Sequence, residues 1–363
     1  MKIRPELLEE RKSYAANTPL VTEDILDCSL GENPYGYPPS VEDALRSFDM
    51  KRMAHYPHSH AAVDGIIAYW KDFAAIKPEN VLLTDGSIGA LYVVNGLFAQ
   101  KGARVTGFEP SFTDMIVNCR LQGMVYEGVP LSKNPDFAAD AAALEDAIDE
   151  RTSVVYIDNP NNPTGQVLAL SELGRIAAKA ASCGACLVID EAYGDFIPQD
   201  ESAVGFLTEY DNVIIVKTFS KGFGLAGLRA GYLLAPEKLV ACMMRLSNPY
   251  MMNEPTRVAV AAAMECADWP VSHSDDFVRA KEEMKKRIGH NLALLRTDMR
   301  VPICALRHRD PDADLQRLLY DAGVMTVSGA EFDGLGASAV RLRVPEAAQH
   351  ARLLDAIERV DRG

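Results

Sequence analysis

One lysine, Lys221, stands between an apolar run and a glycine-rich loop in this 363-residue sequence. The run 213–216 is apolar and β-branched, which is typical of a buried strand. The hydroxyls of Thr218 and Ser220 come just before the lysine, and Arg229 follows the glycines. Hydroxyls and an arginine can hold a phosphate, and a sheltered lysine near a second cation can attack an aldehyde. The spacing therefore indicates a lysine that forms a Schiff base with an aldehyde cofactor.

Two other interpretations of this loop are possible. It could be an exposed turn whose lysine is simply solvated. Residues 222–227 also fit the dinucleotide pattern G-x-G-x-x-G, which requires a helix directly after the glycines and an acid about 20 residues later. The sequence instead turns into a second apolar run at 232–235. The Schiff-base interpretation is therefore favoured.

The elements that must position these residues alternate between strand-like runs and helix-like stretches. This alternation predicts an α/β fold with a mostly parallel sheet covered on both faces. In such sheets ligands bind beyond the carboxyl ends of the strands, where the polar residues of interest lie. The expected strands are 81–84, 104–108, 153–157, 186–189, 213–216 and 232–235, with helices such as 90–100 and 170–182 between them.

A tight turn after the first of these strands starts a helix. The backbone N–H groups of Gly86, Ser87 and Ile88 would lack partners at the start of that helix and could point at an anion. Alternatively, Asp85 or Ser87 simply caps the helix, and no ligand is involved.

The next three strands also lead into side chains that could do chemistry. Phe112 follows the second strand, Asn162 lies in the turn after the third, and Asp190 and Tyr193 follow the fourth. Each position has a plain structural interpretation as well: a core aromatic, a turn residue and a helix cap.

In their order along the chain, these segments resemble the signatures of pyridoxal-phosphate-dependent aminotransferases of fold type I, class I and II. The resemblance covers most of the chain, from about Ser29 to Val344, and implies a large domain around the central sheet and a smaller α+β domain. The run 29–36 resembles the histidinol-phosphate aminotransferase branch. The other matching segments are Ser-Lys-x-x-x-Leu-x-Gly-x-Arg at 220–229, Asn-Pro-x-Asn-Pro-Thr-Gly at 159–165 and Asp-Glu-Ala-Tyr at 190–193.

The resemblance implies a role for each of these residues. Lys221 would hold the cofactor and act as general base and acid, while Asp190 would pair with the pyridine nitrogen. Tyr193 and Asn162 would bond the phenolic oxygen, and Phe112 would stack on the ring. The cofactor phosphate would be held by Gly86, Ser87, Ile88, Thr218, Ser220 and Arg229.

Three more residues are implied for the substrate and for a second subunit. Gly31 would approach the substrate, and Arg341 would grip its α-carboxylate as a bidentate pair. Tyr56 would reach the phosphate of the neighbouring subunit, which implies a homodimer with composite active sites. In the histidinol-phosphate branch a further arginine, thirteen residues before the carboxylate arginine, clamps the substrate phosphate, and Ser328 stands there in this chain. We therefore expect an unphosphorylated amino acid as donor and a 2-keto acid as acceptor.

Other reactions on the same scaffold stay open. A pyridoxal-phosphate decarboxylase or lyase, including one like the threonine-phosphate decarboxylases, shares these motifs, because the motifs do not set which substrate bond breaks. A true histidinol-phosphate aminotransferase is a further alternative. A ligand-sensing protein is not expected, because Lys221 is present.

Composition narrows the partners and the domain layout. The net charge of −14 disfavours nucleic acid and anionic membranes, and no run of 18 apolar residues or signal-peptide core occurs. Seven scattered cysteines fit a reducing cytoplasm, and the lone C-x-x-C at 183–186 does not indicate a metal. Near residue 250 the alternation of strands and helices gives way to a helical run and a charged segment. This change predicts a large domain at 40–250 and a small domain from 1–39 and 251–363.

Overall fold

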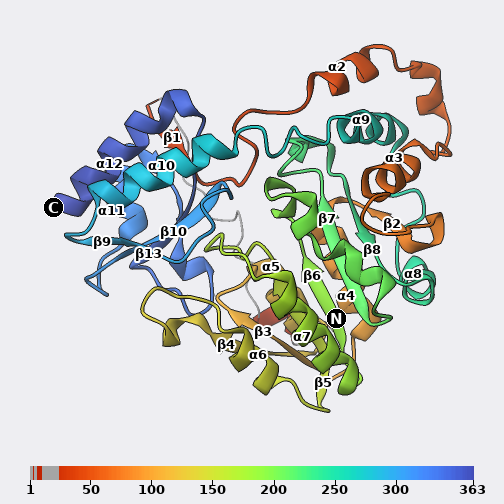
Figure 1. Cartoon of the computed structure of the whole chain (residues 1–363), viewed down its shortest axis with the longest axis horizontal. Helices are drawn as coiled ribbons and strands as arrows, with labels where there is room; N and C mark the ends of the chain where they lie inside the picture. The colour runs from red at the N-terminus through yellow and green to blue at the C-terminus, as the bar shows by residue number, and fades with distance from the viewer. Residues whose placement is uncertain (1–2, 4–5, 10–23) are drawn as a thin grey trace.

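The chain folds around two β-sheets, a large one at the right and lower centre of Figure 1 and a small one at the left. The computed structural model describes residues 3, 6–9 and 24–363. The large sheet has seven strands in the order β2-β8-β7-β6-β5-β3-β4, and the small sheet has four in the order β12-β13-β10-β9. No helix within the described ranges is both long and apolar enough to cross a bilayer.

Most strands of the large sheet run parallel, and the exception is β8. It lies antiparallel between β2 and β7, whereas β7, β6, β5, β3 and β4 form an unbroken parallel series. The strands are β2 (Val81–Thr84), β3 (Arg104–Glu109), β4 (Val125–Pro130), β5 (Thr152–Asp158), β6 (Cys186–Asp190), β7 (Val213–Thr218) and β8 (Gly231–Leu234).

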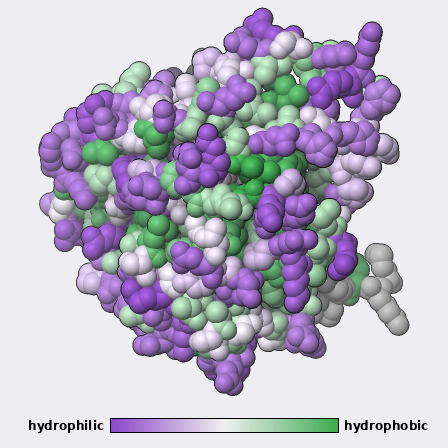
Figure 2. Space-filling view, turned by 45° about the vertical axis from the view of Figure 1, so that its right-hand side comes forward, coloured by the Kyte–Doolittle hydropathy of each residue, from purple (hydrophilic) through white to green (hydrophobic). Residues whose placement is uncertain are grey.

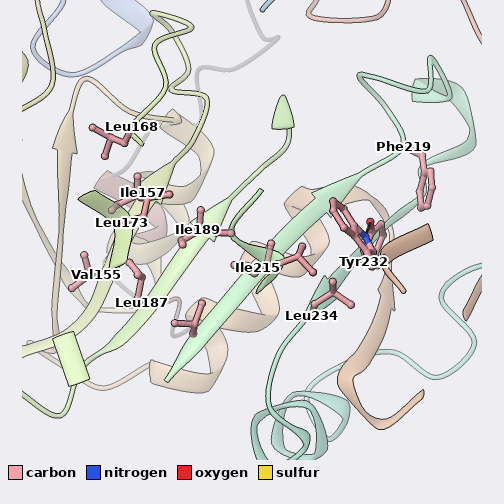
Figure 3. Packing of buried hydrophobic residues seen from close by; sticks show 14 of the residues in the cluster. Val155, Ile157, Leu168, Leu173, Leu187, Ile189, Ile215, Phe219, Tyr232 and Leu234 are labelled. Carbon is pink, nitrogen blue, oxygen red and sulfur yellow. Dashed lines mark hydrogen bonds between the residues drawn. The ribbon is translucent and has the colours of Figure 1, made fainter. Parts of the chain in front are cut away.

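Helices cover both faces of this sheet because each central strand is apolar on both sides. One set of alternate residues, with Val155, Ile189 and Ile215 among them, packs with α3, α6, α7 and α9, and Figure 3 shows this layer. The other set, with Val188 and Ile214, packs with α4, α5 and α8. These helices are α3 (Ala61–Trp70), α4 (Gly86–Phe98), α5 (Thr113–Leu121), α6 (Ala141–Ala147), α7 (Leu170–Ser182), α8 (Glu237–Met244) and α9 (Glu254–Met264).

A second hydrophobic core lies between the small sheet and its helices. The small sheet is antiparallel, and β1 pairs with β11 in parallel beside it. The strands of the small sheet are β9 (Leu292–Leu294), β10 (Ile303–His308), β12 (Val327–Ser328) and β13 (Ala339–Arg343). The separate pair consists of β1 (Leu26–Asp27) and β11 (Val324–Met325). The helices here are α10 (Ser274–Arg287), α11 (Leu315–Asp321) and α12 (His350–Arg362), and the chain also has α1 (Glu6–Glu9) and α2 (Pro39–Arg46).

The predicted mostly parallel α/β sheet is confirmed, with two details that sequence did not supply. Strand β4 was not predicted, because it is a half-exposed edge strand that contains Gly128 and ends at Pro130. Helix α9 packs on α2 and α3, so its residues share the core of the large sheet. The domain boundary at residue 250 stays a prediction, and this packing favours a later one. Most of the N-terminal run without a signal-peptide core lies outside the described residues.

Candidate functional site

Three central strands of the large sheet end in polar side chains at the same edge. β5 ends at Asp158, β6 at Asp190 and β7 at Thr218. Because side chains alternate along a strand, all three point to the face covered by α4 and α5. A cavity of about 390 Å³ opens there. Its lining includes Ser87, Ile88, Phe112, Asp158, Asn162, Asp190, Tyr193, Thr218, Ser220, Lys221 and Arg229.

One end of this cavity is the start of α4. Gly86 has φ +83°, and a Cβ on it would lie 2.9 Å from Arg229 Nη2, so glycine lets the guanidinium approach the helix start. Arg229 Nη1 donates to Ser220 Oγ at 3.3 Å, and Thr218 Oγ1 donates to the same oxygen at 3.0 Å. Arg229 has φ +52°, a left-handed conformation that is costly outside glycine and clusters at functional sites. Hydroxyls, a guanidinium and a helix N-terminus converge here, which suits a phosphate.

Asp190 is a deeply buried carboxylate, only 3% exposed. It accepts hydrogen bonds from Tyr156 Oη at 3.1 Å and from the backbone N–H of Ala192 at 3.0 Å. Burial, followed by the nearby charge of Asp158, raises the pKa of Asp190 to about 7. Among the described residues no lysine, arginine or histidine forms an ion pair with Asp190. A carboxylate in this state favours a ligand that brings a proton or a positive charge.

Arg341 fixes the orientation of the Asn162 side chain. Its Nη1 donates to Asn162 Oδ1 at 3.2 Å, and its Nη2 donates to the carbonyl oxygen of Ser29. A guanidinium has only donors, so the amide oxygen of Asn162 faces it and the amide N–H groups are left for the cavity. Arg341 is 1% exposed and does not line the cavity, and its Nε has no hydrogen-bond partner in the described part of the chain.

Lys221 and Tyr193 lie together, and the N-terminal run 29–36 packs against them. Lys221 Nζ lies 5.6 Å from the ring centroid of Tyr193. A Cβ on Gly31 would come within 1.7 Å of Tyr193 Oη, so only glycine lets the run pass this close. Asn33 Nδ2 donates to the carbonyl oxygen of Gly222 at 2.8 Å, which ties the run to the lysine loop.

Tyr56 lies outside the cavity of its own chain. It is 70% exposed, and its ring stacks on that of Tyr250 with 4.7 Å between centroids. The residues that line the cavity do not include it.

Strand register places Ser328 and its neighbour Val327 differently relative to Arg341. In the pairing of β12 with β13, Val327 lies opposite Arg341, whereas Ser328 lies opposite Val340. Paired residues share a face of the sheet, so Val327 is the residue beside Arg341. Ser328 points the other way, and its hydroxyl caps the short turn at 329–331. Valine is as uncharged as serine, so the absence of a second cation at this point holds for either residue.

Sequence analysis missed several residues that the structure places at the site. Asp158 ends β5 beside Asp190, and the reasoning that singled out a carboxylate at a strand end applied to it equally. Tyr156 had no sequence signal, because its hydrogen bond to Asp190 depends on the register between β5 and β6. Leu30 and Glu32 also line the cavity, and they belong to the run 29–36, in which only Gly31 was given a role.

The residues around the cavity suit pyridoxal phosphate. The α4 end offers donors for a phosphate, Asp190 offers a buried carboxylate for a ring nitrogen, and Lys221 offers an amine for an aldehyde. Asn162 has N–H groups directed to the cavity, and glycine at positions 31 and 86 lets Tyr193 and Arg229 take their places beside it. A mostly parallel sheet with this set at its strand ends defines a fold-type-I pyridoxal-phosphate enzyme.

The sequence matches the family described as aminotransferase class I and II over residues 23–357, and the chain belongs to that family. Histidinol-phosphate aminotransferase 2 of Hydrogenovibrio crunogenus is 34% identical over 240 residues, which are 64% of this chain and 61% of that protein. The histidinol-phosphate aminotransferase of Thermococcus gammatolerans is 32% identical, over 71% of this chain and 72% of that protein.

Solved structures agree in fold. The histidinol-phosphate aminotransferase from Sinorhizobium meliloti, in complex with pyridoxal-5'-phosphate, matches this chain with a TM-score of 0.81 at 22% identity. The match covers 99% of this chain and 98% of that chain. The predicted fold, enzyme class and cofactor are confirmed: this chain is a pyridoxal-phosphate-dependent aminotransferase. The roles of single residues stay predictions.

Proposed function

We propose that this aminotransferase takes its amino group from an unphosphorylated amino acid and gives it to a 2-keto acid, with Lys221 as the cofactor lysine. The observation that carries the proposal is the cavity that Lys221 shares with Asp190, Asn162 and Arg229. Pyridoxal phosphate supplies the electron sink for cleavage of a bond at the substrate α-carbon.

Each residue around the cofactor has its own role. Lys221 Nζ takes the proton from the substrate α-carbon and later returns a proton as general acid. Asp190 holds the ring nitrogen protonated, which its burial without a protein cation favours. Asn162 and Tyr193 donate to the ring oxygen, and Phe112 packs on the ring. The phosphate is held by Gly86, Ser87, Ile88, Thr218, Ser220 and Arg229. Gly31 and Arg341 are assigned to the substrate, although neither lines the cavity and Arg341 meets it through Asn162.

The charges around the cavity support an unphosphorylated donor. In the described part of the chain, Lys221 and Arg229 are the cations that line the cavity, and both serve the cofactor. Other arginines of the small-sheet region are engaged elsewhere: Arg343 donates to the carbonyl oxygens of Leu30 and Asp27, and Arg309 donates to that of Gly289. A buried phosphate dianion without a paired cation is costly.

Histidinol phosphate is the second candidate donor, and the names of the relatives favour it. A panel decides between the two: kcat/KM for histidinol phosphate beside aromatic, aliphatic and acidic amino acids, with 2-oxoglutarate as acceptor. We expect the best amino acid to exceed histidinol phosphate by roughly a hundredfold, the worth of a lost charge-assisted contact. A wide margin for histidinol phosphate would refute the charge argument.

A matched pair of variants sharpens this test. Val327→Arg places a guanidinium on the face of Arg341, so kcat/KM for histidinol phosphate should rise. Ser328→Arg adds the same charge on the opposite face and should leave that ratio unchanged. Equal effects of the two variants would show that the strand face does not select the substrate.

The assignment of Lys221 has its own experiment. Borohydride reduction of the wild-type enzyme should leave the cofactor attached to the peptide that contains Lys221, as found by mass spectrometry. Recovery of the label on another lysine would overturn the assignment.

A homodimer with composite sites is also part of the proposal. Exposed hydrophobic side chains gather in two segments joined by the Tyr56–Tyr250 stack, and patches of this kind mark interfaces. Figure 2 shows hydrophobic residues reaching the surface among hydrophilic ones. The residues are Met50, Met53 and Tyr56 in one segment and Met244, Leu246 and Tyr250 in the other.

A cytoplasmic location is supported by the seven cysteines, all of which are unpaired thiols.

A further inference from the structure

Asp158 is a second buried carboxylate at the strand ends, beside Asp190. It is 4% exposed, lines the cavity and lies opposite Asp190 in the register of β5 with β6. Paired residues of neighbouring strands point to the same face of a sheet, so the two carboxylates stand next to each other. None of the roles given above to the cavity residues requires a carboxylate at this position.

Four hydrogen bonds converge on the Asp158 carboxylate. The Ser111 hydroxyl and the Asn161 side-chain amide donate to Oδ1 at 2.8 and 2.9 Å. The backbone N–H groups of Phe112 and Asn162 donate to Oδ2 at 3.1 and 2.9 Å. One acceptor-only group therefore joins the loop after β3, which carries Phe112, to the loop after β5, which carries Asn162.

An asparagine at position 158 could not make this set of bonds. The two side chains have nearly the same shape, but asparagine presents one oxygen and one NH2 group. Whichever way the amide turns, two of the four donors face the NH2 group, and buried donors left without acceptors are costly. The position thus needs both oxygens of a carboxylate, which is more than a turn alone requires.

The charge of Asp158 also acts on Asp190. Burial raises the pKa of Asp158 to about 6 against the lowering effect of its hydrogen bonds, so it is ionised above that pH. The titratable groups around it are Asp190, Tyr126 and Tyr156, and burial raises the pKa of both tyrosines, which stay neutral. In the described ranges no cation forms an ion pair with either carboxylate. Above about pH 7 both carboxylates are therefore ionised, and two negative charges then stand side by side at these strand ends.

We propose that Asp158 is a positioning residue for amino transfer, which sets Phe112 against Asn162 and adds its charge to that of Asp190 at the ring nitrogen. This role rests on the proposed assignment of Asp190, Asn162 and Phe112 to the cofactor. Because Asp158 acts through those residues, its loss affects cofactor binding and turnover more than affinity for the amino donor.

The test is Asp158→Asn, with three measurements besides activity in the loaded enzyme. They are the cofactor Kd by titration of the cofactor-free protein, the pH midpoint of the visible absorbance of the bound cofactor, and the melting temperature of the cofactor-free protein. We expect the cofactor Kd to rise at least about tenfold. The pH midpoint moves to lower pH, because removal of a negative charge disfavours protonation nearby. In turnover, kcat falls while the donor KM stays within about threefold.

Asp149→Asn is the matched control at the other end of β5. Asp149 is 42% exposed and pairs with Arg104 and Arg151, away from the cavity. This control lowers stability at most and leaves the cofactor Kd and the pH midpoint unchanged. If Asp158→Asn does not fold, Ser111→Ala removes one of the four donors and should still raise the cofactor Kd by about threefold.

The role of Asp158 is overturned if the folded Asp158→Asn protein, or Ser111→Ala in its place, keeps the wild-type cofactor Kd and pH midpoint. A fall in melting temperature with no change in either value would show a merely structural residue. Borohydride labelling of the wild type separates this failure from the failure of the proposed function. Label on Lys221 with an unchanged variant refutes only the role of Asp158, whereas a wild type without that label refutes the assignment of Lys221.

Discussion

Replacement of Lys217 by methionine should destabilise the cofactor-free protein, because Lys217 neutralises two buried carboxylates. Its Nζ lies 2.8 Å from Asp195 Oδ1 and 3.3 Å from Glu191 Oε2, and all three side chains are at most 3% exposed. Glu191 would keep two other donors, the hydroxyl of Ser202 at 2.6 Å and the N–H of Ala203 at 2.7 Å. The loss therefore falls mainly on Asp195.

The magnitude follows from the burial of the pair. Removing one partner of a buried ion pair costs about 3–5 kcal/mol, because the other charge is left uncompensated. Burial raises the pKa of Asp195 even beside the ammonium of Lys217, and loss of the ammonium would raise that pKa further. A raised pKa favours uptake of a proton, which keeps the cost near the lower end of that range, about 3 kcal/mol. For a chain of 363 residues a cost of about 3 kcal/mol corresponds to a fall of roughly 4 °C in Tm.

The assay is thermal unfolding of the cofactor-free proteins, followed by circular dichroism at neutral pH. Lys238→Met, on the exposed side of α8, is the control and should melt like the wild type. The double variant Lys217→Met with Asp195→Asn removes both charges, so its cost should be less than the sum of the single costs by about 2 kcal/mol. The reasoning is refuted if Lys217→Met melts within about 2 °C of the control, or if the two single costs simply add.

Three further outcomes are expected. Asp190→Asn should bind cofactor but lose most amino transfer in a steady-state assay, since the ring nitrogen is no longer held protonated; near-wild-type kcat would contradict this role. Mixing inactive Tyr56→Phe and Lys221→Ala proteins should restore activity through hybrid dimers, unless Tyr56 serves its own chain. Burial lowers the pKa of Lys281 to about 8 from 10.5, so the unfolded chain binds more protons between these pH values and stability rises with pH. Relative to Lys281→Met, the free energy of unfolding of the wild type should rise by about 2 kcal/mol between pH 8 and 10 in denaturant titrations. A difference between the two proteins that does not change with pH would contradict this expectation.

The sequence was enough to find residues that follow the carboxyl ends of parallel strands. Phe112, Asp190, Thr218 and Lys221 were found because such ends meet at one edge of a sheet, whatever the separation along the chain. Asp158 meets the same condition but was not predicted, because a turn alone explains the Asn, Pro and Gly residues that follow it.

Contacts that depend on register or on distant strands could not be predicted. Arg341 orients Asn162 across 179 residues of sequence, and no local pattern encodes that meeting. Whether Val327 or Ser328 shares the sheet face of Arg341 depends on a single step of register, which a count of residues from Arg341 cannot resolve. A shift of one residue in a strand moves a side chain to the other face, so the face that a residue occupies must come from the structure.

The two faces of the central strands connect stability to function. Thr218 and Asp190 point to the cavity, while their neighbours Lys217 and Glu191 meet in the buried ion cluster on the other face. The buried ion cluster on the other face thus holds these strand ends in place without lining the cavity. Since a buried ion pair fails when either partner is lost, the cavity should lose its geometry when that cluster does. Lys217→Met should therefore weaken cofactor binding as well as lower Tm, although Lys217 does not line the cavity.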